Sequence, residues 1–137
     1  MDDEKVDVLG DTMKDLSIYC ITPSYTIKEA LAQIEENKNR AVLVVDDLGR
    51  VSGLLSQGDI IRALASGANL FASVGQFSSP SFMYLKSRDL EKAYQLAKTR
   101  GMTIFPVLDD DFKLIDVLTL FDVFDYVEEK MRGGKDD

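Results

Sequence analysis

A hydroxyl side chain followed three positions later by an aspartate occurs twice in the chain, each time after an apolar, strand-like segment. The two instances are Ser56 with Asp59 and Thr119 with Asp122. This spacing is typical of a capping box, in which both side chains bind backbone N–H groups at the start of a helix. A helix start can also bind a phosphate, and an aspartate on its first turn can accept hydrogen bonds from both hydroxyls of a ribose. The pattern therefore predicts two helix starts and leaves a nucleotide-binding role open.

Other site chemistries are excluded or disfavoured. The chain has no histidine, which removes catalytic triads and imidazole-based metal sites, and its single cysteine rules out an internal disulfide. Cys20 lies in an apolar-leaning segment and is interpreted as a core residue. The acidic turns at 46–47 and 109–111 could hold a divalent cation, but their position between strands favours solvated hairpin turns. We expect no enzyme activity, no metal and no required cofactor.

Composition bounds the class of protein. A length of 137 residues with 45% hydrophobic side chains suits one globular domain. The net charge of −8 disfavours nucleic-acid binding, which needs a basic surface. The uncharged stretch 63–85 is too rich in Ser, Gly and Pro to span a membrane and is interpreted as a helix end followed by a linker. The first residues show no secretion signal, so we expect a cytoplasmic protein.

The chain contains an internal repeat. A shift of 63 residues superposes 24–64 on 87–127 without a gap, and it pairs Asp59 with Asp122. Neither half is large enough to bury a core alone, so the halves should pack together about a pseudo-two-fold axis. The boundaries that we predict are a tail at 1–7, a first repeat at 8–66, a linker at 67–73, a second repeat at 74–131 and a tail at 132–137.

Each repeat is predicted to run strand, helix, strand, strand, helix, which gives an α/β (α+β) fold made of two β-α-β-β-α units. Apolar runs, turn residues and cap residues indicate the elements. In the first repeat these are a strand at 18–22, a helix from the Thr26 cap to 37–39, strands at 41–45 and 51–55, and a helix at 56–65. In the second they are a strand at 82–85, a helix at 89–100, strands at 104–108 and 113–118, and a helix at 119–131, followed by a frayed end.

The repeat and its motif resemble a pair of cystathionine β-synthase (CBS) domains, the Bateman module. The family pattern of glycine, apolar residues, Ser/Thr and aspartate is complete in the segment from Gly53 to Asp59. The segments 22–31 and 104–109 also resemble the family, and the likeness covers about residues 8–130. The second repeat departs from the pattern because Asp116 stands where glycine is usual.

The resemblance implies a regulatory module for an adenosine-containing ligand: AMP, ADP, ATP or S-adenosylmethionine, and in some members NAD(H) or a cyclic dinucleotide. It also implies a homodimer formed through helices, and a separate protein that is regulated. An alternative is a ligand-independent interaction or assembly module with the same fold. Carried onto this chain, the family pattern assigns Asp59 and Asp122 to ribose, Ser56 and Thr119 to ribose or phosphate, Arg40 and Thr103 to phosphate, and Ile21, Val42, Tyr84 and Phe105 to the flanks of the base.

The two predicted ligand sites should differ in affinity. Gly53 would let the backbone approach a ligand at the first site, where Gly58 and two arginines, Arg40 and Arg62, are also expected. At the equivalent positions of the second repeat the formal charge changes from +2 to −2. A carboxylate near a phosphate is repulsive, so we expect the first site to bind more tightly by about 1–3 kcal/mol.

Calorimetric titration of Asp59→Ala and Asp122→Ala with the best nucleotide tests this inequality. Loss of a hydrogen-bonding carboxylate should weaken its own site by roughly 10- to 100-fold. The tighter phase should therefore disappear in Asp59→Ala and persist in Asp122→Ala. The reverse result would contradict the assignment and make Asp116 a selector for ligands with little or no phosphate.

Overall fold

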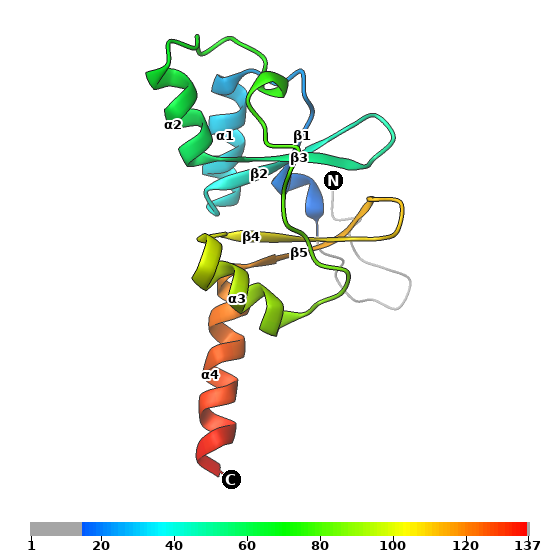
Figure 1. Cartoon of the computed structure of the whole chain (residues 1–137), viewed down its shortest axis with the longest axis vertical. Coiled ribbons are helices and arrows are strands. Elements are labelled where there is room, and N and C mark those ends of the chain that lie inside the picture. The colour runs from blue at the N-terminus through cyan, green and yellow to red at the C-terminus, as the bar shows by residue number, and fades with distance from the viewer. Residues whose placement is uncertain (1–14, 137) are drawn as a thin grey trace.

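Each half of the chain folds into a small sheet flanked by two helices, in nearly the order that the repeat predicts (Figure 1). The computed structural model describes residues 15–136. The first half contains a 3₁₀ helix Leu16–Tyr19, β1 Cys20–Ile21, α1 Ile27–Asn37, β2 Ala41–Val45, β3 Val51–Ser56 and α2 Gln57–Ala65. The second half contains a 3₁₀ helix Val74–Gln76, α3 Leu90–Arg100, β4 Ile104–Leu108, β5 Leu114–Thr119 and α4 Leu120–Asp136.

The strand pairing shows the repeat in backbone geometry. In the first sheet β1 pairs parallel to β2, and β2 pairs antiparallel to β3. In the second sheet β4 pairs antiparallel to β5. The register of β2 shifts between Val44 and Val45, and that of β4 shifts between Val107 and Leu108, which is the equivalent position. The mixed α+β architecture predicted from the sequence is therefore confirmed, with one irregularity repeated in both halves.

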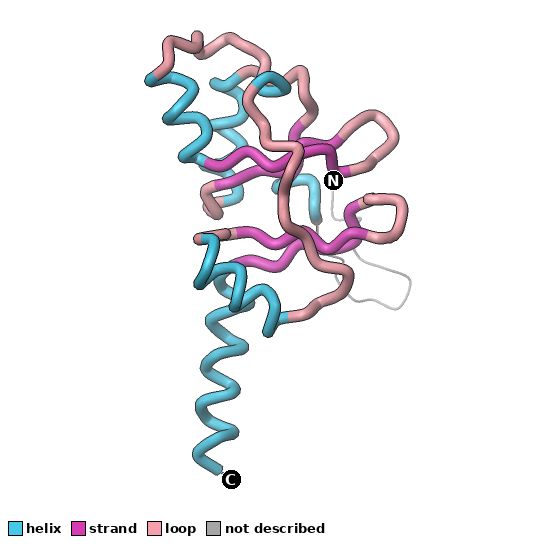
Figure 2. Tube along the Cα trace, in the orientation of Figure 1, coloured by secondary structure: helices cyan, strands magenta, loops and turns pink. Residues whose placement is uncertain are grey.

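Side-chain alternation along the strands divides the apolar residues among three clusters. In β2, Val42 and Val44 pack toward the helices of the first half, whereas Leu43 joins a central cluster between the sheets. In β4, Phe105 packs toward the helices of the second half and Ile104 joins the central cluster. Because successive side chains of a strand point to opposite faces, each sheet is covered on both sides. The α-helices lie outside and the two sheets face each other between them (Figure 2).

The predicted strand at 82–85 is wrong, because the segment makes only one isolated parallel bridge, between Leu85 and Val107. The Leu85 N–H donates to the Pro106 carbonyl (2.8 Å), and the Leu108 N–H donates to the Leu85 carbonyl (2.9 Å). A parallel ladder extended toward Met83 would next need an N–H at position 106. Proline has none, so the ladder stops after one bridge.

Two other predicted boundaries differ from the structure by more than one residue. The strand predicted at 18–22 is reduced to Cys20–Ile21, because the preceding residues form a 3₁₀ helix capped by Asp15. At the other end, α4 runs to Asp136 instead of fraying after Met131, and it projects beyond the body of the second half (Figure 1). Among residues 15–136, no helix has both the length and the hydropathy needed to cross a bilayer.

Candidate functional site

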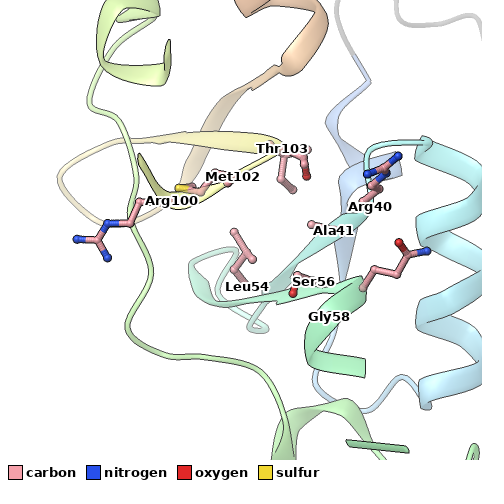
Figure 3. Close-up of a pocket in the computed structure, with 11 residues that line it drawn as sticks. Arg40, Ala41, Leu54, Ser56, Gly58, Arg100, Met102 and Thr103 are labelled. Carbon is pink, nitrogen blue, oxygen red and sulfur yellow. The ribbon is translucent and has the colours of Figure 1, made fainter. Parts of the chain in front are cut away.

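A cavity of about 400 Å³ lies where the two repeats meet (Figure 3). The first repeat contributes the start of β2, the end of β3 and the first turn of α2, while the second contributes the end of α3 and the start of β4. The lining residues are Arg40, Ala41, Leu54, Ser56, Gln57 and Gly58 from the first repeat, and Arg100, Gly101, Met102, Thr103 and Ile104 from the second. A molecule bound here would contact both repeats.

Ser56 ends β3 and caps α2 at the wall of this cavity. Its Oγ accepts a hydrogen bond from the Asp59 N–H (3.1 Å), and the Asp59 carboxylate accepts one from the Ser56 N–H (2.8 Å). The Gln57 N–H donates to the Arg40 carbonyl (2.9 Å), which ties the helix start to the residue before β2. The predicted capping box of α2 is confirmed. Since a hydroxyl that accepts through its oxygen still carries a proton, Ser56 can donate to an oxygen in the cavity.

Two arginines, Arg40 and Arg100, are among the residues that line the cavity, and both are exposed. Figure 3 shows Arg40 and Arg100 on opposite sides of Ser56 and Thr103, with the Arg100 side chain extending away from them. Among the described residues that line the cavity, none is acidic. Arg40 has φ 67°, a left-handed conformation that is unfavourable for a residue with a side chain and that Lys38 and Phe112 share outside the cavity lining. The lining therefore suits an anionic ligand that spans both repeats.

Three of the predicted site residues, Arg40, Ser56 and Thr103, line the cavity, while Asp59 lies just outside it. Asp59 lines a neighbouring hollow of about 520 Å³ together with Arg62. Arg62 Nη2 is 2.6 Å from Asp59 Oδ1, so an ion pair already engages the carboxylate that was predicted to bind ribose. The ribose role of Asp59 stays a prediction.

Three of the four residues predicted to flank a base lie in the core instead. Ile21, Val42 and Phe105 are 2%, 0% and 0% exposed and pack toward the helices. On the two strands that enter the cavity, neighbouring residues point in opposite directions, so Val42 and Phe105 face the helices, and their role beside a base stays a prediction. Ala41 and Ile104, each one residue before its predicted counterpart, line the cavity.

Tyr84, the fourth of these residues, belongs to an aromatic group near the second hairpin. Its ring centroid lies 6.0 Å from that of Phe82 and 5.5 Å from that of Phe112. The Tyr84 side chain packs against the central cluster and does not line the cavity. Its predicted contact with a base stays a prediction.

Gly53 lies against the segment 77–89 rather than in the cavity; this segment joins the 3₁₀ helix Val74–Gln76 to α3, follows the predicted linker at 67–73, and is called the linker from here on. A Cβ at this position would lie 3.0 Å from Ser78 Oγ and 3.1 Å from the Ser79 carbonyl oxygen. Ser79 forms an isolated antiparallel bridge with Leu54, so the linker runs along β3 at this point. The predicted close approach at Gly53 exists, but the approaching group is the chain's own linker, and Gly53 does not line the cavity.

The second repeat contains a cation, Arg88, that is not among the positions from which the charge of the second site was predicted. Arg88 Nη1 lies 2.7 Å from Asp116 Oδ2, and Arg88 Nη2 lies 3.7 Å from Asp122 Oδ1. The Asp122 carboxylate also accepts a hydrogen bond from the Thr119 N–H (2.8 Å), and Thr119 is only 8% exposed. Arg88 thus offsets part of the negative charge predicted for the second site. Neither Thr119 nor Asp122 lines the cavity.

Tyr19 lies near these acidic groups from the start of the first repeat. Burial raises the pKa of its phenol, and the charges of Asp122 and Asp116 raise it further. The phenol is therefore protonated at neutral pH.

Arg100 and Met102 line the cavity but are not among the site residues predicted from the sequence. The repeat offers a signal for them, because Arg40 immediately precedes β2. A pseudo-two-fold axis places the segment that precedes β4 opposite Arg40, and the predicted site residues include only Thr103 from that segment. Both repeats contribute their strand-entry segments to one cavity. The residues of either repeat alone therefore form only part of the cavity wall.

The other residues that could act as a nucleophile or as metal ligands have structural roles. Burial raises the pKa of the Cys20 thiol to about 11, so the thiol is protonated and a poor nucleophile. Asp46 accepts hydrogen bonds from the Arg50 and Leu48 N–H groups, chiefly the former, and these lower its pKa. Asp109 makes the equivalent bonds in the second hairpin. Within residues 15–136 no group of acidic or cysteine side chains could hold a metal ion.

Comparison with known proteins connects the fold to one family. A family model described as "CBS domain" matches residues 9–66 and 74–129. The magnesium transporter MgtE of Thermus thermophilus is 27% identical over 90% of this chain and 29% of its own length. An uncharacterized protein of Helicobacter pylori strain J99 is 29% identical over 80% of this chain and 34% of its own length. The chain therefore spans about a third of the length of these relatives.

Solved structures show the same arrangement. The structure of CBSX2 in complex with AMP superposes with a TM-score of 0.66 at 28% identity, covering 82% of this chain and 88% of that one. The cytosolic domain of the Mg²⁺ channel MgtE in complex with ATP gives a TM-score of 0.62 at 26% identity, covering 78% of this chain and 44% of that one. A putative acetoin utilization protein of Vibrio cholerae, with a TM-score of 0.71 at 16% identity over 87% of this chain and 89% of that one, shows the fold alone.

The two glycines near α2 should respond oppositely to alanine. Gly53→Ala would press a methyl group against Ser78 and Ser79 and should lower the free energy of unfolding by about 1–3 kcal/mol. A Cβ at Gly58 meets Arg62 Nη1 at 3.5 Å, an ordinary contact, so Gly58→Ala should leave stability unchanged or raise it by up to about 1 kcal/mol. Urea unfolding measures both, and equal effects would contradict the linker role of Gly53.

Proposed function

The chain belongs to the CBS domain family, and we propose that the cavity between its repeats binds a phosphorylated adenosine nucleotide as a regulatory ligand. The observation that carries this proposal is the lining itself, which contains Arg40 from one repeat and Arg100 from the other and no acidic side chain among its described residues. Two similar proteins, CBSX2 and the cytosolic domain of MgtE, were solved in complex with AMP and ATP, which supports this ligand class.

The chemistry of the lining suggests how a nucleotide would lie. Arg40 and the first turn of α2 provide a cation and a positive helix end for phosphate. Leu54, Met102 and Ile104 provide apolar surface for the base. In this proposal the ribose faces the end of β3, where Ser56 can donate a hydrogen bond and Asp59 lies one turn further along the helix.

The same lining disfavours S-adenosylmethionine, which was an equal candidate on resemblance alone. Its sulfonium centre is a cation, and two guanidinium groups would repel it in a partly desolvated cavity. A phosphate reverses the sign of that interaction and can also form charge-assisted hydrogen bonds with arginine. The cavity should therefore bind a phosphorylated adenosine nucleotide in preference to S-adenosylmethionine, although both contain adenosine.

We propose a regulatory rather than a catalytic role for the bound nucleotide. A ligand held by Arg40 and Arg100 would bridge the two repeats and so favour one arrangement of them over another. That preference would reach a separate partner protein through a surface of the module. A ligand-independent assembly role is the second candidate, and it is favoured by the exposed apolar side chains described next.

We propose that the module pairs with a second copy through the face formed by α3 and α4. Phe121, Phe124 and Met131 are 68%, 53% and 63% exposed, and the first two rings stack edge to face. A mainly apolar hollow of about 560 Å³ lies between the two helices, beside Tyr94 and Val127. Such surfaces on a small domain commonly mark a protein interface, and pairing of identical faces is the commonest symmetry.

Light scattering should therefore give twice the mass of one chain at micromolar concentration, with and without nucleotide. Phe124→Asp should shift the mass toward the monomer, because it places a charge within the apolar face. Leu48→Asp is the matched control, since Leu48 is 63% exposed on the hairpin turn, away from α4, and its substitution should leave the mass unchanged. A monomeric wild-type chain under all conditions would contradict the pairing.

Thermal unfolding with a panel of ligands tests nucleotide binding. The panel is AMP, ADP, ATP, S-adenosylmethionine, NAD(H) and cyclic dinucleotides, added to protein first shown to be free of bound nucleotide. A ligand at about 100 times its Kd stabilises by about 2.7 kcal/mol, which corresponds to several degrees for a chain of this size. We expect this shift with at least one of AMP, ADP and ATP and none with S-adenosylmethionine.

Variants of the cavity sharpen the same experiment. Arg100→Ala should reduce the nucleotide-induced shift, because it removes one of the two lining cations. Arg50→Ala is the control, since Arg50 pairs with Asp46 on the first hairpin and does not line the cavity. If every adenosine compound left the melting temperature unchanged, the assembly role would replace the nucleotide-binding role.

A further inference from the structure

Arg62 and Asp59 form an ion pair at the edge of the proposed nucleotide cavity. Arg62 Nη2 lies 2.6 Å from Asp59 Oδ1, and Asp59 Oδ2 accepts the Ser56 N–H at 2.8 Å. Both carboxylate oxygens are therefore engaged within the protein. The Arg62 side chain is 72% exposed and that of Asp59 is 23% exposed, so the guanidinium lies on the solvent side of the carboxylate.

The guanidinium also lies close to the cavity wall. An ideal Cβ built at Gly58 would be 3.5 Å from Arg62 Nη1 and 3.7 Å from Ser56 Oγ, and both Gly58 and Ser56 line the cavity. Arg62 thus stands beside the first turn of α2, where the proposed phosphate would bind. A small rotation of its flexible side chain would move the charge from the carboxylate to that position.

We propose that Arg62 is a specificity-determining residue that exchanges partners when a nucleotide binds. The ligand phosphate takes the guanidinium from Asp59, and Asp59 Oδ1 becomes available to the ribose hydroxyls. Recognition of phosphate and recognition of ribose are coupled in this way. The inference rests on the nucleotide-binding role proposed above and adds to it a preference for nucleotides over nucleosides.

The exchange is feasible because the ion pair between Arg62 and Asp59, which must break first, is weak. An exposed pair at i, i+3 on a helix contributes little to stability, since water screens both charges. A phosphate offers Arg62 a partner of higher charge and bidentate geometry. A nucleoside offers no such partner and must compete with Arg62 for the same carboxylate oxygen.

The second repeat lacks the exchanging residue. Asp125 stands at the position equivalent to Arg62. The cation near Asp122 is Arg88, which comes from the segment before α3 and is held by Asp116 at 2.7 Å. Arg88 therefore already has a second carboxylate partner, which would retain it when a ligand approaches. Exchange of the kind proposed is specific to the first repeat.

Calorimetric titration of the full chain tests the exchange. The two ligands are adenosine and whichever of AMP, ADP and ATP binds most tightly. Arg62→Gln should weaken nucleotide binding by about 10-fold, because one charge-assisted contact to phosphate is lost. The same variant should strengthen adenosine binding by about two- to fivefold, because Asp59 no longer has a competing partner. Arg62→Lys keeps the charge and should retain most of the nucleotide affinity.

Arg132→Gln is the matched control, since Arg132 pairs with Glu129 at the same helical spacing (3.0 Å) on the projecting part of α4. It should change neither affinity. Equal weakening of both ligands by Arg62→Gln, or no change in either, would overturn the exchange while wild-type nucleotide binding upheld the proposed function. A wild-type chain that bound none of the three nucleotides would overturn both.

Discussion

The structure depends on one apolar layer that neither repeat could bury alone. Leu43 and Val51 from the first sheet meet Ile104, Leu108 and Val117 from the second, and all five are at most 4% exposed. Each sheet covers its other face with its own helices, so the central layer is the interaction that joins the halves. The cavity begins at the edge of this layer, where the strand-entry residues are too small or too polar to continue the apolar packing.

The strand-entry segments of both repeats meet at that edge, and their backbone geometry is unusual. Lys38 and Arg40 have φ of 60° and 67°, and Gly101 has φ 69° at the end of α3. The Thr103 hydroxyl donates to the Asn39 carbonyl across the repeats. Two chain segments that turn sharply and bind each other leave room beside them, and the start of α2 closes that space. The cavity is thus a consequence of how the helices end and the strands begin.

Local charge at the cavity opposes the charge of the whole chain. The net charge is −8, yet the described lining carries two arginines and no acid. A distant negative field is screened by salt over about 10 Å, whereas groups in contact inside a cavity are not. An acidic protein can therefore hold an anion without attracting nucleic acid broadly. The two halves also differ at one equivalent position. Gly53 is uncharged and packs against the linker, whereas Asp116 forms an ion pair with Arg88.

The sequence by itself determined the repeat, the order of its elements and the capping box at Ser56 and Asp59, because these depend on local periodicity and on spacings within one helical turn. It pointed to Arg40 and Thr103 because both immediately precede a strand, and both line the cavity, while their contact with phosphate stays a prediction. Only the tertiary structure decided which strand face meets the other repeat, so Ala41 and Ile104 replaced Val42 and Phe105 at the cavity. A strand buried on both faces has no polar alternation to reveal its orientation. Contacts between distant segments, such as Arg88 with Asp116, Gly53 with Ser78, and Arg100 opposite Arg40, arise from packing that no local pattern encodes.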